Sequence, residues 1–135
     1  MSRRSCNILL ACGAMVLGCF LYVCFRSTTY VALLFQRISA IRQLQAFSCD
    51  FCAYYFPDFL WAFSLCCLLN AIHLPRKPGT WVCGVAAFSL GALWEGLQYR
   101  QAVSGTGDYW DILAYLLAAL LSTIINLGGR EHEKT

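Results

Sequence analysis

Long apolar runs separated by short polar segments dominate this chain. Four runs, at about residues 8–25, 59–74, 81–99 and 109–127, approach the roughly 20 apolar residues that an α-helix needs to cross the hydrocarbon core of a bilayer. Short turns that contain proline or glycine separate the last three runs. The pattern predicts an all-α polytopic membrane protein, a bundle of four transmembrane helices that forms one integral membrane domain over residues 1–135.

The segment between the first two runs is less apolar but still periodic. Val31, Leu34, Ile38 and Ile41 recur at helical spacing, and polar residues fall on the opposite side. Such a pattern is typical of a helix that lies along the membrane interface or re-enters the membrane. We therefore expect an extra interfacial or re-entrant helix at about residues 30–47, between spans 1 and 2.

The composition agrees with lipid as the main solvent. Hydrophobic residues make up 59% of the 135 residues and charged residues 13%, whereas a soluble domain carries about 25% charged residues. The net charge of +3 is small and dispersed, so no nucleic-acid partner is expected. No His-rich metal set, serine triad or phosphate loop is visible, so we expect neither a metal nor a cofactor.

Nine cysteines are present, most of them within the apolar runs, where a free cysteine behaves as a small hydrophobic residue. The odd number argues against a disulfide framework. Two questions about cysteines stay open. Cys49 and Cys52 have the spacing for a local disulfide, and residues 16–19 resemble a lipoprotein cleavage box that would process the first span at Cys19 instead of retaining it.

Lys and Arg residues near the spans predict the orientation. With the N-terminus inside, the cytoplasmic side holds six basic residues and the outer side four. The inner set is Arg3, Arg4, Arg76, Lys77, Arg130 and Lys134, and the outer set is Arg26, Arg37, Arg42 and Arg100. This bias predicts that both termini lie on the cytoplasmic side, N-in and C-in.

In an antiparallel bundle, the start of span 2, the end of span 3 and the start of span 4 share the outer edge of the membrane. Acidic, amide and aromatic side chains concentrate at this edge, and the opposite edge offers few of them. The sequence therefore predicts an outward-facing polar pocket for a ligand or partner, with these candidate residues: Asp58, Trp61, Glu95, Gln98, Arg100, Asp108 and Asp111.

Glu95 is the most unusual member of this set. An ionisable side chain near the centre of a span costs roughly 2.5–3.5 kcal/mol, and Glu95 lies about 21 Å along the helix from Trp81. Gln98, three residues after Glu95, lies on the same face of the helix. Arg100 is not on that face, but it could fold back towards Glu95 and Gln98 from the loop. Glu95 therefore either makes a structural hydrogen bond to another helix or serves a ligand or partner. The bland alternative for Asp108 is an N-cap, and for Asp111 a favoured acid at N3.

Three motifs resemble the VanZ-like family of small bacterial membrane proteins. The resemblance extends over residues 56–122, about half of the chain. The motifs within it read Pro57-Asp58-Phe59-Leu60-Trp61, Trp94-Glu95-Gly96-Leu97-Gln98 and Gly105-Thr106-Gly107-Asp108-Tyr109-Trp110-Asp111-Ile112-Leu113-Ala114-Tyr115. Two departures are visible: Phe59 and Trp61 stand where many relatives carry a basic residue and a histidine, and Ala118-Ala119 stand where many have a glycine. The first departure removes a possible acid–base pair and weakens a catalytic interpretation.

The resemblance implies a small helical bundle in the bacterial cytoplasmic membrane and an association with the cell envelope and the response to glycopeptide antibiotics. The leading hypothesis is a non-catalytic protein whose pocket binds a membrane lipid, a lipid-linked envelope precursor or a membrane-protein partner. One alternative is a structural subunit of a larger complex, docked through the small residues of span 3 or through span 1. Another is a small intramembrane enzyme that acts on lipid-linked phosphates through Glu95 and Asp111, or through a divalent cation held there.

Overall fold

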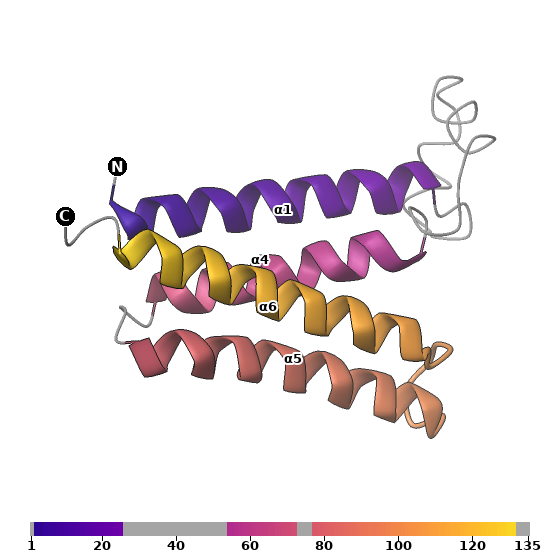
Figure 1. Ribbon diagram of the computed structural model, residues 1–135. Coiled ribbons are helices and arrows are strands. Elements are labelled where there is room, and N and C mark those ends of the chain that lie inside the picture. The colour runs from indigo at the N-terminus through magenta and orange to yellow at the C-terminus, as the bar shows by residue number, and fades with distance from the viewer. Residues whose placement is uncertain (1, 26–53, 73–76, 132–135) are drawn as a thin grey trace.

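The computed structural model describes residues 2–25, 54–72 and 77–131, which form helices and no strand (Figure 1). In chain order the helices are α1 (Arg3–Phe25), α4 (Phe56–Ile72), α5 (Lys77–Tyr99) and α6 (Tyr109–Glu131). The expected all-α fold is therefore confirmed for this part of the chain. The expected helix at residues 30–47, together with Cys49 and Cys52, lies outside the described residues.

The helices run alternately up and down, so that both chain ends lie at one end of the bundle (Figure 1). The start of α4, the end of α5 and the start of α6 lie at the other end, called here the hairpin end because the turn between α5 and α6 is there. This arrangement brings the three motif segments together, as the sequence predicts.

Each helix extends beyond its apolar run at one end. α1 begins at Arg3 rather than near residue 8, and the hydroxyl of Ser2 accepts a hydrogen bond from the amide of Ser5 (3.2 Å), as an N-cap does. α6 continues to Glu131, through Gly128 and Gly129, beyond the apolar run that ends near residue 127. There the guanidinium of Arg3 donates to the carbonyl of Gly129, which stabilises this last turn.

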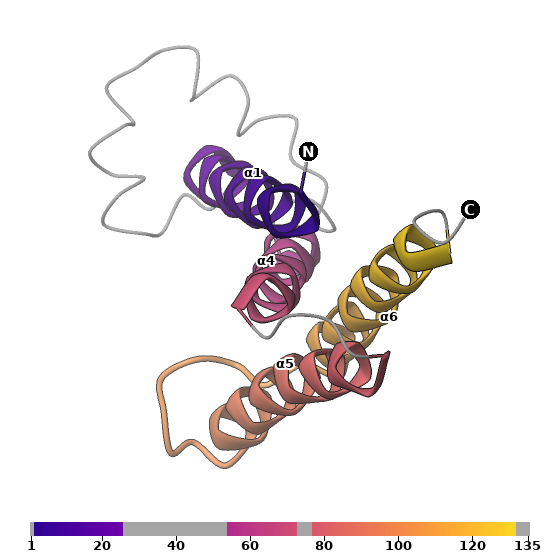
Figure 2. The same cartoon turned by 90° about the vertical axis from the view of Figure 1, so that its left-hand side faces the viewer.

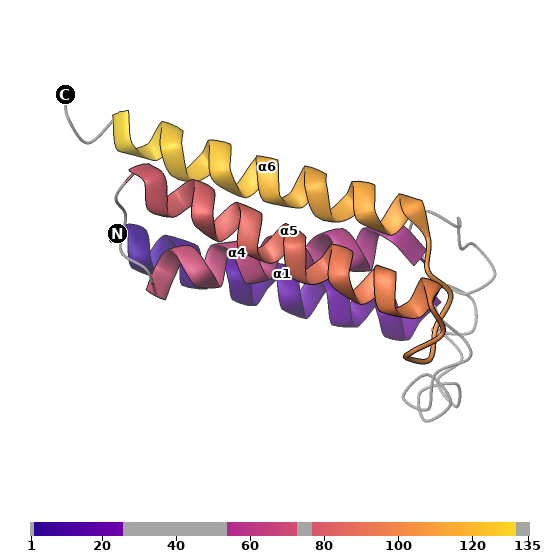
Figure 3. The ribbon, with the colours of Figure 1, turned by 90° about the horizontal axis from the view of Figure 1, so that it is seen from below.

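α4 occupies the middle of the bundle and contacts each of the other three helices (Figures 2 and 3). Its buried residues are mostly small, and Ala62, Cys66 and Cys67 have no exposed surface. Towards α1, the hydroxyl of Ser64 donates to the carbonyl of Ala11 (2.8 Å). Small and hydroxyl side chains of this kind let helices approach closely in a membrane, where burial of apolar surface does not drive association.

α5 packs on α6 through a stripe of small residues, Gly84, Ala87 and Gly91. A Cβ atom added at Gly84 would lie 2.7 Å from Oγ1 of Thr123, and one at Gly91 would overlap the ring of Tyr115. The small residues of α5 therefore serve contacts within this chain.

The outward faces of the helices are strongly apolar. Large side chains such as Val16 (68% exposed) and Ile124 (64% exposed) point away from the bundle, which is the reverse of what a water-soluble surface requires. Three helices are long and apolar enough to cross a membrane, and α4, with 17 residues, is at the short limit for a span. The chain is a membrane protein.

Polar contacts join α1 to α6 at the end that holds the chain termini. The side-chain amide of Asn7, which is buried, donates to Oδ1 of Asn126 (2.8 Å), and Asn126 donates in turn to the carbonyl of Ser122 (2.9 Å). These bonds satisfy amide groups that would otherwise be costly in hydrocarbon.

Candidate functional site

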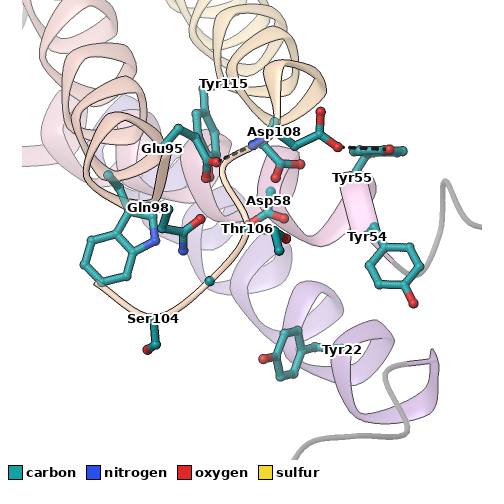
Figure 4. Close-up of a pocket in the computed structure, with 13 residues that line it drawn as sticks. Tyr22, Tyr54, Tyr55, Asp58, Glu95, Gln98, Ser104, Thr106, Asp108 and Tyr115 are labelled. Carbon is teal, nitrogen blue, oxygen red and sulfur yellow. Dashed lines mark hydrogen bonds between the residues drawn. The ribbon is translucent and has the colours of Figure 1, made fainter. Parts of the chain in front are cut away.

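A polar cavity of about 840 Å³ opens at the hairpin end (Figure 4). All four helices and the turn between α5 and α6 contribute to it. Its lining residues are Tyr22, Tyr54, Tyr55, Asp58, Trp94, Glu95, Gln98, Ser104, Gly105, Thr106, Asp108, Asp111 and Tyr115. Five of the seven residues predicted from the sequence, Asp58, Glu95, Gln98, Asp108 and Asp111, are among them.

Glu95 is buried, with 4% of its surface exposed, and both of its carboxylate oxygens accept hydrogen bonds. The hydroxyl of Tyr115 on α6 donates to Oε1 (3.1 Å), and the backbone amide of Asp108 donates to Oε2 (3.0 Å). Glu95 thus makes the structural bond to another helix that was one of its two expected roles. These two donors offset the cost of an acid inside the membrane.

Asp108 connects the turn, α6 and α4. Its Oδ1 accepts a hydrogen bond from the amide of Trp110 (3.0 Å), so it is the N-cap of α6, as the sequence indicates. Its Oδ2 accepts a hydrogen bond from the hydroxyl of Tyr55 (3.3 Å) beside the start of α4. Figure 4 shows the hydrogen bond from the Asp108 amide to Glu95 and the one from Tyr55 to Asp108. One carboxylate therefore both starts a helix and holds the α4 side of the cavity.

The turn between α5 and α6 lies tightly against the end of α5. A Cβ atom at Gly107 would lie 2.7 Å from the backbone nitrogen of Tyr99 and 2.9 Å from the carbonyl oxygen of Glu95. Gly105 has a φ of 141°, a conformation that favours glycine, and the side-chain amide of Gln98 occupies the space beside it. The two glycines fix the course of the turn that forms one wall of the cavity.

Asp58 and Asp111 line the cavity from α4 and α6, and both are half-buried. Asp58 lies in the first turn of α4 and Asp111 in the first turn of α6, positions at which an acid also stabilises the positive end of the helix dipole. Their joint presence at one cavity agrees with the predicted convergence of the span ends.

Two predicted residues lie elsewhere. Arg100 is exposed just after the end of α5, and it lines a second hollow of about 200 Å³ that shares Glu95 and Asp108 with the cavity. Arg100 is therefore not among the described residues that line the cavity itself, and its approach to Gln98 stays a prediction. Trp61, 43% exposed, lines the apolar grooves beside the cavity rather than the cavity itself.

Sequence reasoning missed several cavity residues. Tyr115 lies one turn beyond Asp111, at i+4 on the same face of α6, and this spacing could have identified it. Tyr22 has no comparable signal, because it is one aromatic residue within an apolar span. Ser104 and Thr106 lie in the turn, whose course over the cavity depends on its two tight glycines.

The cavity is acidic and aromatic. Four of the seven acidic residues of the chain line it, and no basic residue is among the described residues of its lining. In the same part of the chain, no three His, Cys, Asp or Glu side chains are grouped as the ligands of a metal ion would be. The carboxylate oxygens suit a polar group that donates hydrogen bonds.

Comparisons with protein-family models, with curated proteins and with solved structures yielded no match to this chain.

Proposed function

We propose that this chain is a VanZ-like protein of the bacterial cytoplasmic membrane, with four spans, N-in and C-in, whose outward-facing cavity binds a membrane lipid or a lipid-linked precursor of the cell envelope. The observation that carries the proposal is the polar cavity of about 840 Å³ at the hairpin end. Its size is that of a small-molecule site. The cavity lies at the ends of helices whose outer faces are apolar. It would therefore be level with the headgroups of the surrounding lipids, and we infer that the polar part of a lipid is its ligand.

The residues that resemble the family support the same proposal. Asp58, Glu95, Gln98, Asp108 and Asp111 come from all three motifs, and each of them lines the cavity. Helix capping alone explains Asp108, but it does not explain Gln98. The Gln98 side chain lies one helical turn after Glu95 and contacts Gly105 in the segment between α5 and α6. Binding of a cell-envelope ligand would also connect the protein to the glycopeptide response that the resemblance implies.

One observation weighs against the alternative of a structural subunit that docks through α5. The small-residue stripe of α5, considered as a docking surface for a larger complex, is covered by α6.

Retention of lipid during purification tests the proposal. We expect native mass spectrometry of the detergent-extracted protein to show a bound lipid, and we expect Asp58→Asn, Gln98→Ala and Asp111→Asn each to reduce its occupancy. Loss of one hydrogen bond corresponds to about a two- to tenfold loss of affinity. Glu131→Gln, which removes an acid at the opposite end of α6, is the matched control.

All variants should reach the membrane in wild-type amounts, because the three side chains are half-buried and lie outside the apolar core. Equal lipid occupancy in the wild type and in all three cavity variants would contradict the proposal. A different result would assign the cavity to a protein partner. In that case a second membrane protein, and no lipid, would co-purify with the wild type, and the three cavity variants would lose it.

A further inference from the structure

The second hollow, of about 200 Å³, lies on a different face of the α5–α6 hairpin from the cavity. On α5, the residues Ala92, Gly96 and Tyr99 line it and recur at helical spacing, so they share one face. Trp94 and Gln98 line the cavity from the other side of the same helix. The hollow is therefore a separate place at which the hairpin meets its surroundings.

Arg100 is the one basic residue in the described lining of this hollow, and it is exposed. Its backbone amide donates to the carbonyl of Gly96 (3.2 Å), but its guanidinium makes no hydrogen bond or ion pair within the described part of the chain. A guanidinium is planar and carries five N–H donors, a geometry that matches two oxygens of one phosphate group. The side chain is therefore available to an anion from outside the chain.

Two acids, Glu95 and Asp108, also line the hollow, so their charges have to be weighed against that of Arg100. Both oxygens of each carboxylate already accept hydrogen bonds. Two of the donors are the hydroxyls of Tyr115 and Tyr55, which line the cavity. An anion bound by Arg100 would thus contact the guanidinium directly, whereas the carboxylates act on it at longer range and weaken the attraction.

The polarity of the hollow changes along the helices. Near its top, the rings of Tyr99 and Tyr109 are exposed, with centroids 6.2 Å apart, and exposed tyrosines at the ends of spans are typical of the headgroup level of a membrane. Ala92 lies seven residues before Tyr99, about 10 Å deeper along α5. Ile112 lies three residues after Tyr109, about 4.5 Å deeper along α6. A cation and two hydroxyls therefore lie above an apolar floor.

We propose that Arg100 binds the phosphate of a membrane phospholipid at this hollow, with the hydroxyls of Tyr99 and Tyr109 as further donors. The first carbons of an acyl chain would lie against Ala92 and Ile112. A volume of about 200 Å³ is below that of a site for a whole ligand, so the rest of the lipid stays in the surrounding leaflet. The site is independent of the ligand proposed for the cavity, and it fixes the level of the hairpin in the membrane.

Photocrosslinking of the full chain in uncharged maltoside micelles tests the site. The two probes are a phosphatidylglycerol and a glucosyl diacylglycerol, each with the same diazirine on the first carbons of one acyl chain. We expect the phosphatidylglycerol to label peptides that contain residues 92–100 or 109–112 at about tenfold lower concentration than the glycolipid. Inorganic phosphate at the concentration of the probe should leave this labelling unchanged, because it has no chain to place on the apolar floor.

Variants of Arg100 test the role of the guanidinium. Arg100→Gln should remove most of the advantage of phosphatidylglycerol at the hairpin, and Arg100→Lys should retain part of it, since lysine keeps the charge but not the planar group. Both variants should fold as the wild type does, because the guanidinium bonds to no described residue. The matched control is Arg4→Gln, which removes an exposed arginine at the opposite end of the bundle and should leave labelling of the hairpin unchanged.

Each contrary result has a distinct meaning. Equal labelling of the hairpin by the two probes, or an advantage of phosphatidylglycerol that survives Arg100→Gln, would overturn the site. Loss of labelling to an equal concentration of inorganic phosphate would assign Arg100 to a soluble anion and overturn the lipid. An equal loss in Arg4→Gln would show a general attraction between the charges of the protein and the probe, and would also overturn the site. The lipid proposed for the cavity is tested separately, by its retention in Asp58→Asn and Asp111→Asn.

Discussion

Glu95 shows how one side chain in a membrane span can serve the fold and still belong to a binding site. From the sequence, its position a few ångströms below the membrane surface indicates a partner or a task, but the sequence does not identify the donor groups. Both donors, the amide of Asp108 and the hydroxyl of Tyr115, lie within the α5–α6 hairpin. They lie more than three turns away along the chain, beyond the reach of periodicity, because the course of the turn decides which groups meet Glu95.

Replacement of Glu95 separates loss of charge from loss of hydrogen bonds. Glu95→Ala leaves two donors without an acceptor, and we expect the free energy of unfolding to fall by about 2–4 kcal/mol. Glu95→Gln keeps one acceptor for the Asp108 amide and offers an NH₂ group to the Tyr115 oxygen, so a loss below about 1 kcal/mol is expected. Unfolding with SDS, followed by circular dichroism, measures both. Equal losses would mean that charge, not hydrogen bonding, holds Glu95.

Asp108 offers a second residue-level test, because capping needs an acceptor and not a charge. Asp108→Ala should destabilise the protein by about 1–2 kcal/mol through loss of the N-cap of α6, and Asp108→Asn should retain most of the stability. The same unfolding experiment applies. A large loss for Asp108→Asn would show instead that the bond from Tyr55 depends on a carboxylate.

At the scale of the elements, the sequence predicts the existence of the helices better than their ends and faces. Apolar runs end where polar residues begin, whereas α5 already starts at Lys77 and α6 continues through Gly128 and Gly129. Small residues show the same limit. A Cβ atom added at Gly18 would lie 3.4 Å from the Cβ atom of Leu60, whereas one added at Gly13 would have no atom within 4 Å. Glycines that pack against another helix and glycines that do not look alike in the sequence. They differ only in which helix lies beside them, which is a property of the tertiary structure.

The glycines of α5 give a matched pair for this argument. Gly91→Ala would push the ring of Tyr115 away and separate its hydroxyl from Glu95, so we expect a loss of about 1–2 kcal/mol. Gly96 is exposed on the same helix, and a Cβ atom added there would have no atom within 4 Å. Gly96→Ala should therefore stabilise the protein by about 0.5–1 kcal/mol. Thermal unfolding of both variants measures these changes in stability. An unchanged stability of Gly91→Ala would contradict the close approach of α5 and α6.

For the whole molecule, antiparallel succession was enough to predict that the acids gather at one end. The sequence could not predict which polar side chains line the same cavity. Arg100 lies in a second hollow and not among the described residues of the cavity, because side-chain positions in the hairpin depend on the exact path of residues 101–107. The central place of α4, the shortest of the four helices, was also not predictable, since its apolar composition resembles that of its neighbours.

The number of crossings has a direct test in living cells. We expect reporter proteins fused to either terminus to be active on the cytoplasmic side, and a reporter inserted at Ser104 to be active on the opposite side. This result requires that α4 crosses the membrane despite its 17 residues. Termini on opposite sides would reduce the crossings to the three longer helices.

The hydrogen bonds of Glu95 also have a consequence for biosynthesis. Both donors come from the hairpin that contains Glu95 itself, so this bonding is complete as soon as the ribosome has released α6, without help from earlier parts of the chain. We therefore expect α5 and α6 to leave the translocon already joined. The cavity, which also needs residues of α1 and α4, forms only when the hairpin meets those helices.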